Sequence, residues 1–297
     1  HLPIPEGFTY DQQPSRDASS IALDNKVYVC GIYSDGDNMQ YVGNKMKKDL
    51  WDGVHGAVPT TYEMSPSIAN LAPAMAWMFY TQMTPNDYFV NGVGGKGYVK
   101  TSYSTSSYFT SYWQDTRDLM EVLDQKEVRT WNSGDSIAIV NIMGNQADGL
   151  IEGYGGGSYK APTIIGNKPF VQMISYGAEN ASEYDNEKDK LLDLLASKPK
   201  EQPLYVFMHI HCWSSPYNVW ADFVNEVELA SSGNIKFLTA GQIFQIMDVE
   251  TLAASENTFY LVNLFLGCAL PAAVFILVVA KKSKVPTKPT KMKRREI

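Results

Sequence analysis

A pair of carboxylates, Asp35 and Asp37, follows the apolar run 27–33, with one serine between the run and the first aspartate. An extended chain places residues two apart on the same face, so both carboxylates can project toward one ligand. Two carboxylates can hydrolyse a glycosidic bond, one as the acid and the other as the base or nucleophile. Asp, Gly and Asn also favour turns and helix caps, so the segment is either part of a site or a turn.

A pair of histidines, His209 and His211, ends a second apolar run that begins at Leu204. Alternation places both imidazoles on one face of the expected strand. The pair could bind a divalent metal together with Asp35 and Asp37, and such a metal is the only cofactor that the sequence suggests. Without a metal, an imidazole could act as a general base or donate a hydrogen bond to a substrate. The two histidines could also be hydrogen-bonded lumen residues without a chemical role.

Further residues follow other expected strands and are candidate substrate contacts. They are Asn38, Glu63, Gly95, Gly97, Tyr98, Asp148, Glu152 and Trp213. One of the three acidic residues in this set could supply the second catalytic carboxylate if the neighbouring aspartates stand too close together to flank one bond. The glycine-rich loop 92–98 has neither G-x-G-x-x-G nor Walker spacing, so a nucleotide is not its expected ligand.

Apolar and β-branched runs predict strands, and helical patterns predict the connections between them. The strands are expected at residues 27–33, 58–62, 87–90, 136–142, 170–175, 204–210 and 235–239. The helices are expected at residues 39–51, from 65 onward, and at 107–125, 185–197, 218–230 and 241–248. This alternation implies an α/β fold with a parallel sheet, and its size favours a (β/α) barrel of about seven to eight strands over residues 26–250. An open doubly wound sheet is the alternative.

The long loops of this pattern follow strands, which places the candidate residues at the carboxyl end of the sheet. Active sites of (β/α) barrels lie at that end. The first and last strands of a closed barrel meet, so the carboxylate pair and the histidine pair are expected to converge over the lumen. Odd-numbered residues of 205–211 are expected to face the lumen, and even-numbered residues the helices.

Three segments of the chain resemble the GxGYxYP proteins, a family of glycoside hydrolases named for that motif. They are the run from Tyr33 to Gln40 with its Ser-Asp-Gly-Asp-Asn core, Ser65-Pro66 with Leu71-Ala72-Pro73, and Gly95-Lys96-Gly97-Tyr98-Val99. Lys100 and Thr101 stand where the motif has its last Tyr and Pro. The resemblance covers residues 26–248 and implies the barrel-like carboxyl-terminal domain of that family, acting on a carbohydrate.

The chain of 297 residues has a net charge of −7, which is unevenly distributed. Residues 281–297 contain eight Lys or Arg and one Glu, so this tail carries +7 and the remainder carries −14. Such an acidic body argues against a nucleic-acid partner. The 18 tyrosines and 6 tryptophans suit the packing of sugar rings on aromatic faces.

Residues 259–280 form a run of 22 residues without a charge, directly before the basic tail. Such a run can cross a bilayer as a tilted helix. The positive-inside rule then predicts a single-pass protein of the cell membrane, with the body outside the cell and the tail 281–297 in the cytoplasm. Residues 1–25 are expected to be an irregular lead or a linker from an upstream part, and residues 251–258 a linker to the membrane.

These observations favour a membrane-anchored, extracellular, carbohydrate-active protein, and the resemblance implies a glycoside hydrolase. One alternative is a metal-dependent hydrolase similar to polysaccharide deacetylases, which would use an aspartate together with His209 and His211. The other is a glycan-binding or cell-envelope protein without activity. A chelator-sensitive metal would identify the first alternative, and sugar binding without turnover would identify the second.

Overall fold

The structure is a computed structural model that describes residues 4–36, 38–99, 107–131, 133–153, 158–176, 181–200 and 202–247. All of these residues lie in the first of two units of the chain, His1–Leu252 and Ala253–Ile297. Asp37, Lys100, Thr101, the linker 251–258, the expected membrane span and the basic tail lie outside the described residues. None of the described helices combines the length and the apolar character that crossing a membrane requires.

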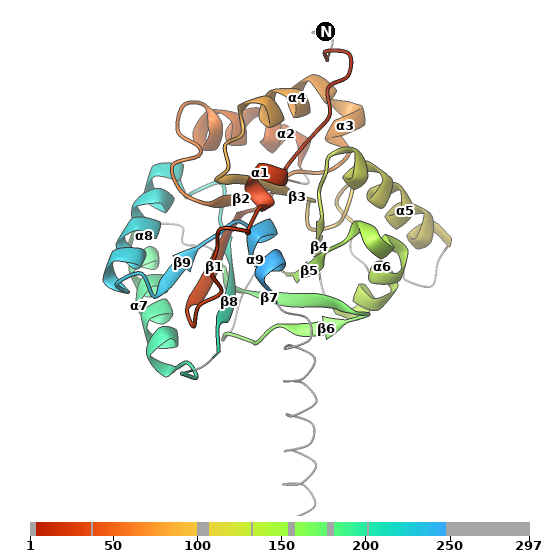
Figure 1. The fold of residues 1–297 in the computed structure, drawn as a ribbon. Coiled ribbons are helices and arrows are strands. Elements are labelled where there is room, and N and C mark those ends of the chain that lie inside the picture. The colour runs from red at the N-terminus through yellow and green to blue at the C-terminus, as the bar shows by residue number, and fades with distance from the viewer. Residues whose placement is uncertain are drawn as a thin grey trace, which may run out of the picture. The chain divides into compact units, whose positions relative to one another are not determined.

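Seven parallel strands lie side by side and curve into a nearly closed barrel (Figure 1). In sheet order they are β3 (Asp87–Val90), β2 (Thr60–Glu63), β1 (Val27–Tyr33), β8 (Leu204–Ile210), β7 (Lys168–Tyr176), β5 (Gly149–Glu152) and β4 (Glu127–Thr130). Two short strands complete the sheet, β6 (Thr163–Ile165) antiparallel to β7 and β9 (Ile235–Phe237) parallel to β1. The predicted parallel, barrel-like α/β sheet is therefore confirmed.

β1 is an interior strand, paired along both edges and buried on both faces. All seven of its residues are buried, as its continuous apolar sequence predicts for a strand covered on both sides. β8 pairs with one edge along its whole length, from Val27↔Leu204 to Tyr33↔Ile210, while β9 and β2 share the other edge. This pairing brings the carboxyl ends of β1, β2 and β8 to the same edge of the sheet.

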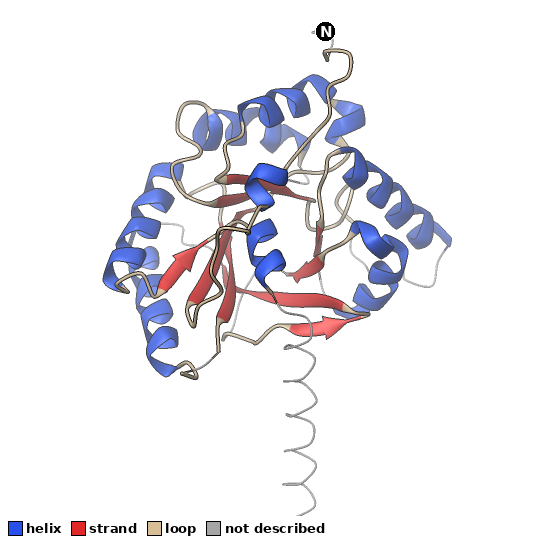
Figure 2. Cartoon of the chain, viewed as in Figure 1, coloured by secondary structure: helices blue, strands red, loops and turns tan. Residues whose placement is uncertain are grey.

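Helices cover the outside of the barrel and also lie at its amino end (Figure 2). Those outside are α2 (Met39–Tyr41) with the π-helix η1 (Val42–Trp51), α3 (Ile68–Leu71), α4 (Pro73–Gln82), α5 (Ser107–Val122), η2 (Ser133–Asp135), α6 (Ser136–Met143), η3 (Gly144–Gln146), α7 (Ala181–Ser197) and α8 (Tyr217–Ala230). The short helices α1 (Gln13–Arg16) and α9 (Ala240–Ile246) lie beside each other over the middle of the barrel (Figure 1).

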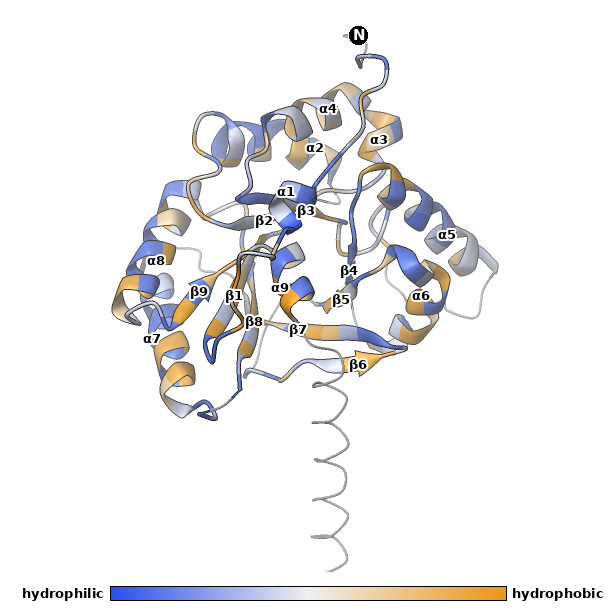
Figure 3. Cartoon of the chain, in the orientation of Figure 1, coloured by the Kyte–Doolittle hydropathy of each residue, from blue (hydrophilic) through white to orange (hydrophobic). Residues whose placement is uncertain are grey.

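Apolar side chains fill both faces of the barrel wall, and Figure 3 shows hydrophobic residues along β7 and β8. Val206 and Met208 belong to the outer core cluster, which also contains Trp220 of α8. Phe207 faces the lumen, where its ring lies 5.5 Å from that of Phe244 on α9. The predicted alternation of β8 is therefore confirmed, and α9 fills the lumen toward its amino end.

The lead residues 4–24 pack against the amino end of the barrel. The Gln12 side chain accepts a hydrogen bond from the Phe89 N–H at 2.6 Å and donates one to the Phe89 carbonyl at 3.0 Å, as a neighbouring strand would. Arg16 forms an ion pair with Asp124 at 3.1 Å. The lead thus covers the edge of β3 that faces away from β2.

A single amide side chain joins the two end strands of the sheet, β3 and β4. Asn91 follows β3, is fully buried, donates to the Arg129 carbonyl at 3.2 Å and accepts from the Arg129 N–H at 2.7 Å. Asn91 directly precedes the glycine loop, residues 92–98. This amide therefore couples the loop to β4 and brings the barrel close to closure.

Two parts of the secondary-structure prediction are wrong. Residues 136–142, expected as a strand, lie in α6, where Ile139 and Val140 are buried but Ile137 is 61% exposed. A short apolar run fits a strand or a helix equally well, and here the helix buries only one side of it. The pattern also misses β4, whose sequence is half charged, and β5, which lies inside the expected loop 143–157.

Glu127, the first residue of β4, is a fully buried acid at the amino end of the barrel. Burial raises its pKa to about 7, although the Tyr88 hydroxyl and the Arg16 guanidinium oppose that shift. The folded protein holds this carboxyl protonated, so its stabilising effect is complete below pH 4.5 and is lost as the pH rises through 7. We expect the free energy of unfolding to fall by up to about 3 kcal/mol across that window.

Glu127→Gln keeps the shape of the side chain and removes its titration, so the decline of stability with pH should flatten. Urea unfolding from about pH 4 to about pH 8 measures the effect. The matched variant Glu121→Gln, at an exposed position of α5, should keep the decline of the wild-type protein. An equally steep decline in Glu127→Gln would contradict this assignment.

Candidate active site

Three of the residues predicted to act in catalysis, Asp35, His209 and His211, lie at the carboxyl ends of β1 and β8. Tyr33 pairs with Ile210, so Asp35 and His211 each leave the sheet just beyond the same pair of adjacent strand ends. The Trp213 indole donates a hydrogen bond to the Asp35 carboxylate. Asp37 lies outside the described residues, so its place in this group stays a prediction.

The backbone turns sharply at Asp35, and this turn changes which β1 residues face the lumen. Even-numbered residues of β1 pack in the lumen and odd-numbered ones against the helices, so Ser34, not Asp35, continues the lumen face. Asp35 has φ +63° and stands half-buried at the rim. The expectation that strand parity aims Asp35 at the lumen is therefore wrong, because the strand ends before it.

Gly36 is required where the loop after β1 crosses the end of β2. A Cβ atom at Gly36 would lie 1.6 Å from the Glu63 carbonyl oxygen, so no other residue fits there. The Gly36 carbonyl also accepts from the Ser65 N–H at 2.7 Å. The Asn38 side-chain oxygen accepts from the N–H groups of the first turn of α2 at 3.0 and 3.3 Å, which makes Asn38 the helix cap, and its role as a substrate contact stays a prediction.

Ser34 and His209 form a buried polar contact inside the mouth of the barrel. The Ser34 Oγ atom lies 3.4 Å from His209 Nε2, and the two residues are 3% and 4% exposed. Burial lowers the His209 pKa to about 3, and the charges of Arg129 and His211 act in the same direction. The imidazole is therefore neutral at neutral pH. The His211 ring lies closer to solvent and contacts Ser214 Oγ at 2.7 Å.

Glu63 is fully buried in an ion pair with Arg129. The sequence predicts Glu63 as a substrate contact, but its carboxylate is not accessible to a substrate. The Arg129 Nε atom donates to Glu63 Oε1 at 2.6 Å, and its Nη1 atom donates to the Gly153 carbonyl at 2.7 Å. Arg129 thereby ties the end of β2 to the residue that follows β5. The pair positions the mouth of the barrel instead of reacting there.

A small polar cavity opens at the carboxyl ends of β4, β5 and β7, and is called the mouth pocket below. Its volume is about 150 Å³, and Trp131, Glu152, Gly153, Ser158, Lys160, Gln172 and Met173 line it. Glu152 ends β5, is 9% exposed, and accepts a hydrogen bond from the Gln172 amide. Of the predicted acidic residues that the structure describes, Glu152 is the one that lines this pocket.

The glycine loop has a backbone conformation that its glycines and Tyr112 stabilise, and it places Tyr98 beside the mouth pocket. Gly95 has φ +90°, and the Tyr112 hydroxyl donates to the carbonyls of Gly94 and Gly97 at 2.8 and 3.0 Å. Tyr98 is 63% exposed, and its ring meets that of Trp131 edge-on at 5.1 Å. Gly95 and Gly97 thus serve the loop conformation, and Tyr98 is the residue available to a ligand.

Asp148 lies at the opposite end of the barrel from the other candidates. It precedes β5, and its N–H donates to the Lys126 carbonyl at 2.8 Å, just before β4. The prediction that Asp148 belongs to the carboxyl end is wrong, because the expected loop 143–157 contains β5. Glu152 remains at the carboxyl end because it closes that strand.

The residues of the mouth that escape the sequence analysis include Ser34, Trp131, Lys160 and Gln172. Two of them had a usable signal: Ser34 keeps the even parity of β1, and Trp131 directly follows β4. Lys160 and Gln172 come near Glu152 only through the pairing of β5 with β7. That pairing has no local sequence signature.

No group of three His, Cys, Asp or Glu side chains that could hold a metal ion occurs among the residues that the structure describes. Asp35 bonds to Trp213, and His209 Nε2 faces a serine hydroxyl. The described part of the expected metal site thus shows no assembled set of metal ligands, and we assign no chemical step to a metal.

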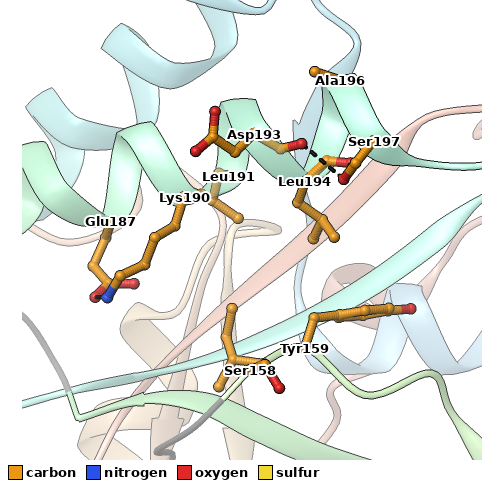
Figure 4. A pocket seen from close by; sticks show the side chains of 10 residues that line it. Ser158, Tyr159, Glu187, Lys190, Leu191, Asp193, Leu194, Ala196 and Ser197 are labelled. Atoms are coloured by element: carbon orange, nitrogen blue, oxygen red, sulfur yellow. Dashed lines mark hydrogen bonds and ion pairs between the residues drawn. The ribbon is translucent and has the colours of Figure 1, made fainter.

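A larger cavity of about 730 Å³ lies outside the barrel wall, between α7 and the segment around Tyr159 (Figure 4). Leucines of α7 form much of its wall, and Lys190 pairs with Glu187 at 2.7 Å. The Ser197 hydroxyl donates to the Asp193 carbonyl at 2.9 Å. Glu187 thus has a cation beside it, and Asp193 is exposed, so neither of these two acids is both shielded from solvent and free of an ion pair.

Comparison with known proteins supports the described fold. The family model for the "GxGYxYP putative glycoside hydrolase C-terminal domain" matches residues 25–247. No curated protein sequence matches the chain. A crystal structure of a "putative hydrolase" from Bacteroides thetaiotaomicron VPI-5482 is similar, with TM-score 0.63 and 20% identity over 80% of this chain and 48% of that one. This chain thus spans about half the length of the Bacteroides protein.

A second solved structure shows the same kind of fold at lower similarity, and a third is less similar. The Puue allantoinase has TM-score 0.50 and 13% identity over 74% of this chain and 89% of that chain. A "probable Polysaccharide deacetylase" from Pseudomonas aeruginosa PAO1 has TM-score 0.47 and 11% identity over 74% of this chain and 90% of its own. Identities this low bear on the fold alone.

Proposed function

The chain belongs to the GxGYxYP family by its carboxyl-terminal domain, and on this premise we propose that the barrel mouth binds a glycan and hydrolyses a glycosidic bond. The observation that carries the proposal is Glu152, an almost buried carboxylate in a polar pocket where barrel enzymes hold their active sites. Asp35 supplies a second carboxylate at the same end of the sheet. Two carboxylates are what glycoside hydrolysis requires.

The two carboxylates have different surroundings, which suits different roles. Glu152 is shielded from solvent, which suits the acid that protonates the leaving oxygen, and the Gln172 amide orients its carboxyl group. Asp35 is half-buried and held by the Trp213 indole, so it acts as the base or nucleophile. Asp37 is proposed as a further carboxylate of this group.

Aromatic rings stand beside each carboxylate and suit the apolar faces of sugar rings. Trp213 is 47% exposed next to Asp35, and its ring lies 5.3 Å from that of Tyr41. Tyr98 is 63% exposed and touches Trp131, which lines the mouth pocket with Glu152. Exposed rings of this kind give a sugar large contact area at low entropic cost.

Release of reducing ends from a panel of polysaccharides tests the proposal, with and without EDTA. We expect hydrolysis of at least one glycan, insensitive to the chelator. Loss of activity in EDTA would favour the metal-dependent hydrolase, with Asp35, Asp37, His209 and His211 as candidate ligands. Glycan binding without turnover would favour the binding protein and contradict the proposed activity.

We also propose that the barrel is extracellular and anchored by residues 259–280, with the tail 281–297 in the cytoplasm. The basis is the uncharged run and its basic flank. Protease added to intact cells should leave the lysine-rich tail uncut and should cut it after permeabilisation, as an antibody against the last residues would record. Cleavage of the tail from outside would refute this topology.

A further inference from the structure

Lys160 is a cation of the mouth pocket that lacks an ion-pair partner among the residues that the structure describes. Its side chain is exposed and lines the same cavity as Glu152, Gln172 and Trp131. Lys96, on the neighbouring glycine loop, has its charge compensated by Asp115 at 2.5 Å. The charge of Lys160 is therefore available to a ligand.

The size of the mouth pocket limits what Lys160 can meet there. Its volume of about 150 Å³ holds about five water molecules, which suits one small ring better than a chain. Trp131 offers that ring an aromatic wall, which Tyr98 braces edge-on. Ser158 adds a hydroxyl, and Gln172 already donates to the Glu152 carboxylate.

The negative charge of the rest of the chain bears on which ligand Lys160 can attract. Outside the basic tail the chain carries −14, and this body repels anions at long range. An anionic ligand would thus depend on a local contact, and an ammonium group is a strong partner for a carboxylate or a phosphate.

We propose that the mouth pocket binds an acidic sugar, with its anionic group on Lys160 and its ring against Trp131, within reach of Glu152. The anionic group is a uronic acid carboxylate or a sulfate or phosphate ester. This inference rests on the proposed function, because it specifies the substrate class of the same site.

Titrations of the full-length protein with single sugars test the proposal, with binding measured by calorimetry or ligand-observed NMR. The probes are glucuronic acid, glucose 6-sulfate, glucose 6-phosphate, and the neutral glucose and glucuronamide. We expect acidic sugars to bind more tightly than the neutral ones, and whichever acidic probe binds best identifies the anionic group. Lys160→Gln should weaken acidic binding about three- to tenfold and leave neutral binding unchanged.

Two control variants separate charge from structure. Lys160→Arg should keep most of the affinity for acidic sugars, because the cation is kept. Lys200→Gln makes the same charge change at an exposed position between α7 and β8, toward the amino end, and should have no effect. Equal affinity for acidic and neutral sugars, or acidic binding that Lys160→Gln leaves unchanged, would overturn the inference.

The outcomes also distinguish this inference from the proposed activity. Hydrolysis of neutral glycans without binding of acidic sugars would overturn the inference and leave the proposed hydrolysis intact. Binding of acidic sugars that depends on Lys160, without hydrolysis of any glycan, would support the inference and contradict the catalytic role of Glu152.

Discussion

Glu152→Gln should lower kcat for glycan hydrolysis by about 10²- to 10⁴-fold, because the amide fills the same space but cannot transfer a proton. Asp35→Asn should cause a loss of similar size, because it removes the second carboxylate. Neither change should much alter the KM, since the aromatic rings that would hold the sugar stay in place. Initial rates on the best polysaccharide of the panel measure the effect.

Asp148→Asn is the matched control, since it makes the same chemical change at the amino end of the barrel. It should retain wild-type activity. All three variants should unfold at urea concentrations close to that of the wild type, because Asp35 and Glu152 contribute little to the apolar core. If Asp35→Asn unfolds the domain, the turn interpretation of its segment is correct, and if Glu152→Gln keeps full activity, the proposed acid is wrong.

Sequence patterns predict the strands of this barrel best where the sequence of a strand is mainly apolar. The bounds expected for β1, β3 and β8 agree with the structure, because these strands are buried on both faces and their sequences are almost entirely apolar. β4 fails this criterion, since the ionisable residues Glu127 and Arg129 make up half of it and are fully buried. The charge of Arg129 is balanced by Glu63, 66 residues away, and burial keeps Glu127 protonated, and a local sequence window detects neither effect.

The sequence likewise predicts only part of the candidate site. The order of the elements along the chain suffices to place Asp35, His209 and His211 at one end of the sheet, because β1 and β8 are adjacent and parallel. It does not show that Glu63 is sequestered by Arg129, which is 66 residues away. It also cannot assign Asp148, because a single unrecognised strand, β5, moves that residue to the opposite end.

The Glu63–Arg129 ion pair joins the core of the barrel to its mouth. Both side chains are fully buried. The same guanidinium holds the Gly153 carbonyl, directly after Glu152, and its charge helps to keep His209 neutral. Removal of this cation should therefore affect both the stability of the fold and the geometry of the site.

Arg129→Met should destabilise the barrel by about 3–5 kcal/mol, because it leaves the Glu63 carboxylate buried without its main cation. Urea unfolding measures the loss. The double variant Arg129→Met with Glu63→Leu should recover much of it, since replacing both partners of a buried pair by apolar groups is often nearly neutral. Lys188→Met, which breaks an exposed ion pair with Glu226 at 3.1 Å, is the matched control and should cost far less.

The double variant also separates stability from positioning. It should fold, but it lacks the guanidinium that holds the Gly153 carbonyl, so Glu152 loses the neighbour that fixes the end of β5. Glycan hydrolysis should therefore stay well below the wild-type rate even where stability has returned, as a displacement of about 1 Å can cost about 10²-fold in rate. Wild-type activity in the stable double variant would show that Arg129 supports the fold alone and that Glu152 is held by Gln172.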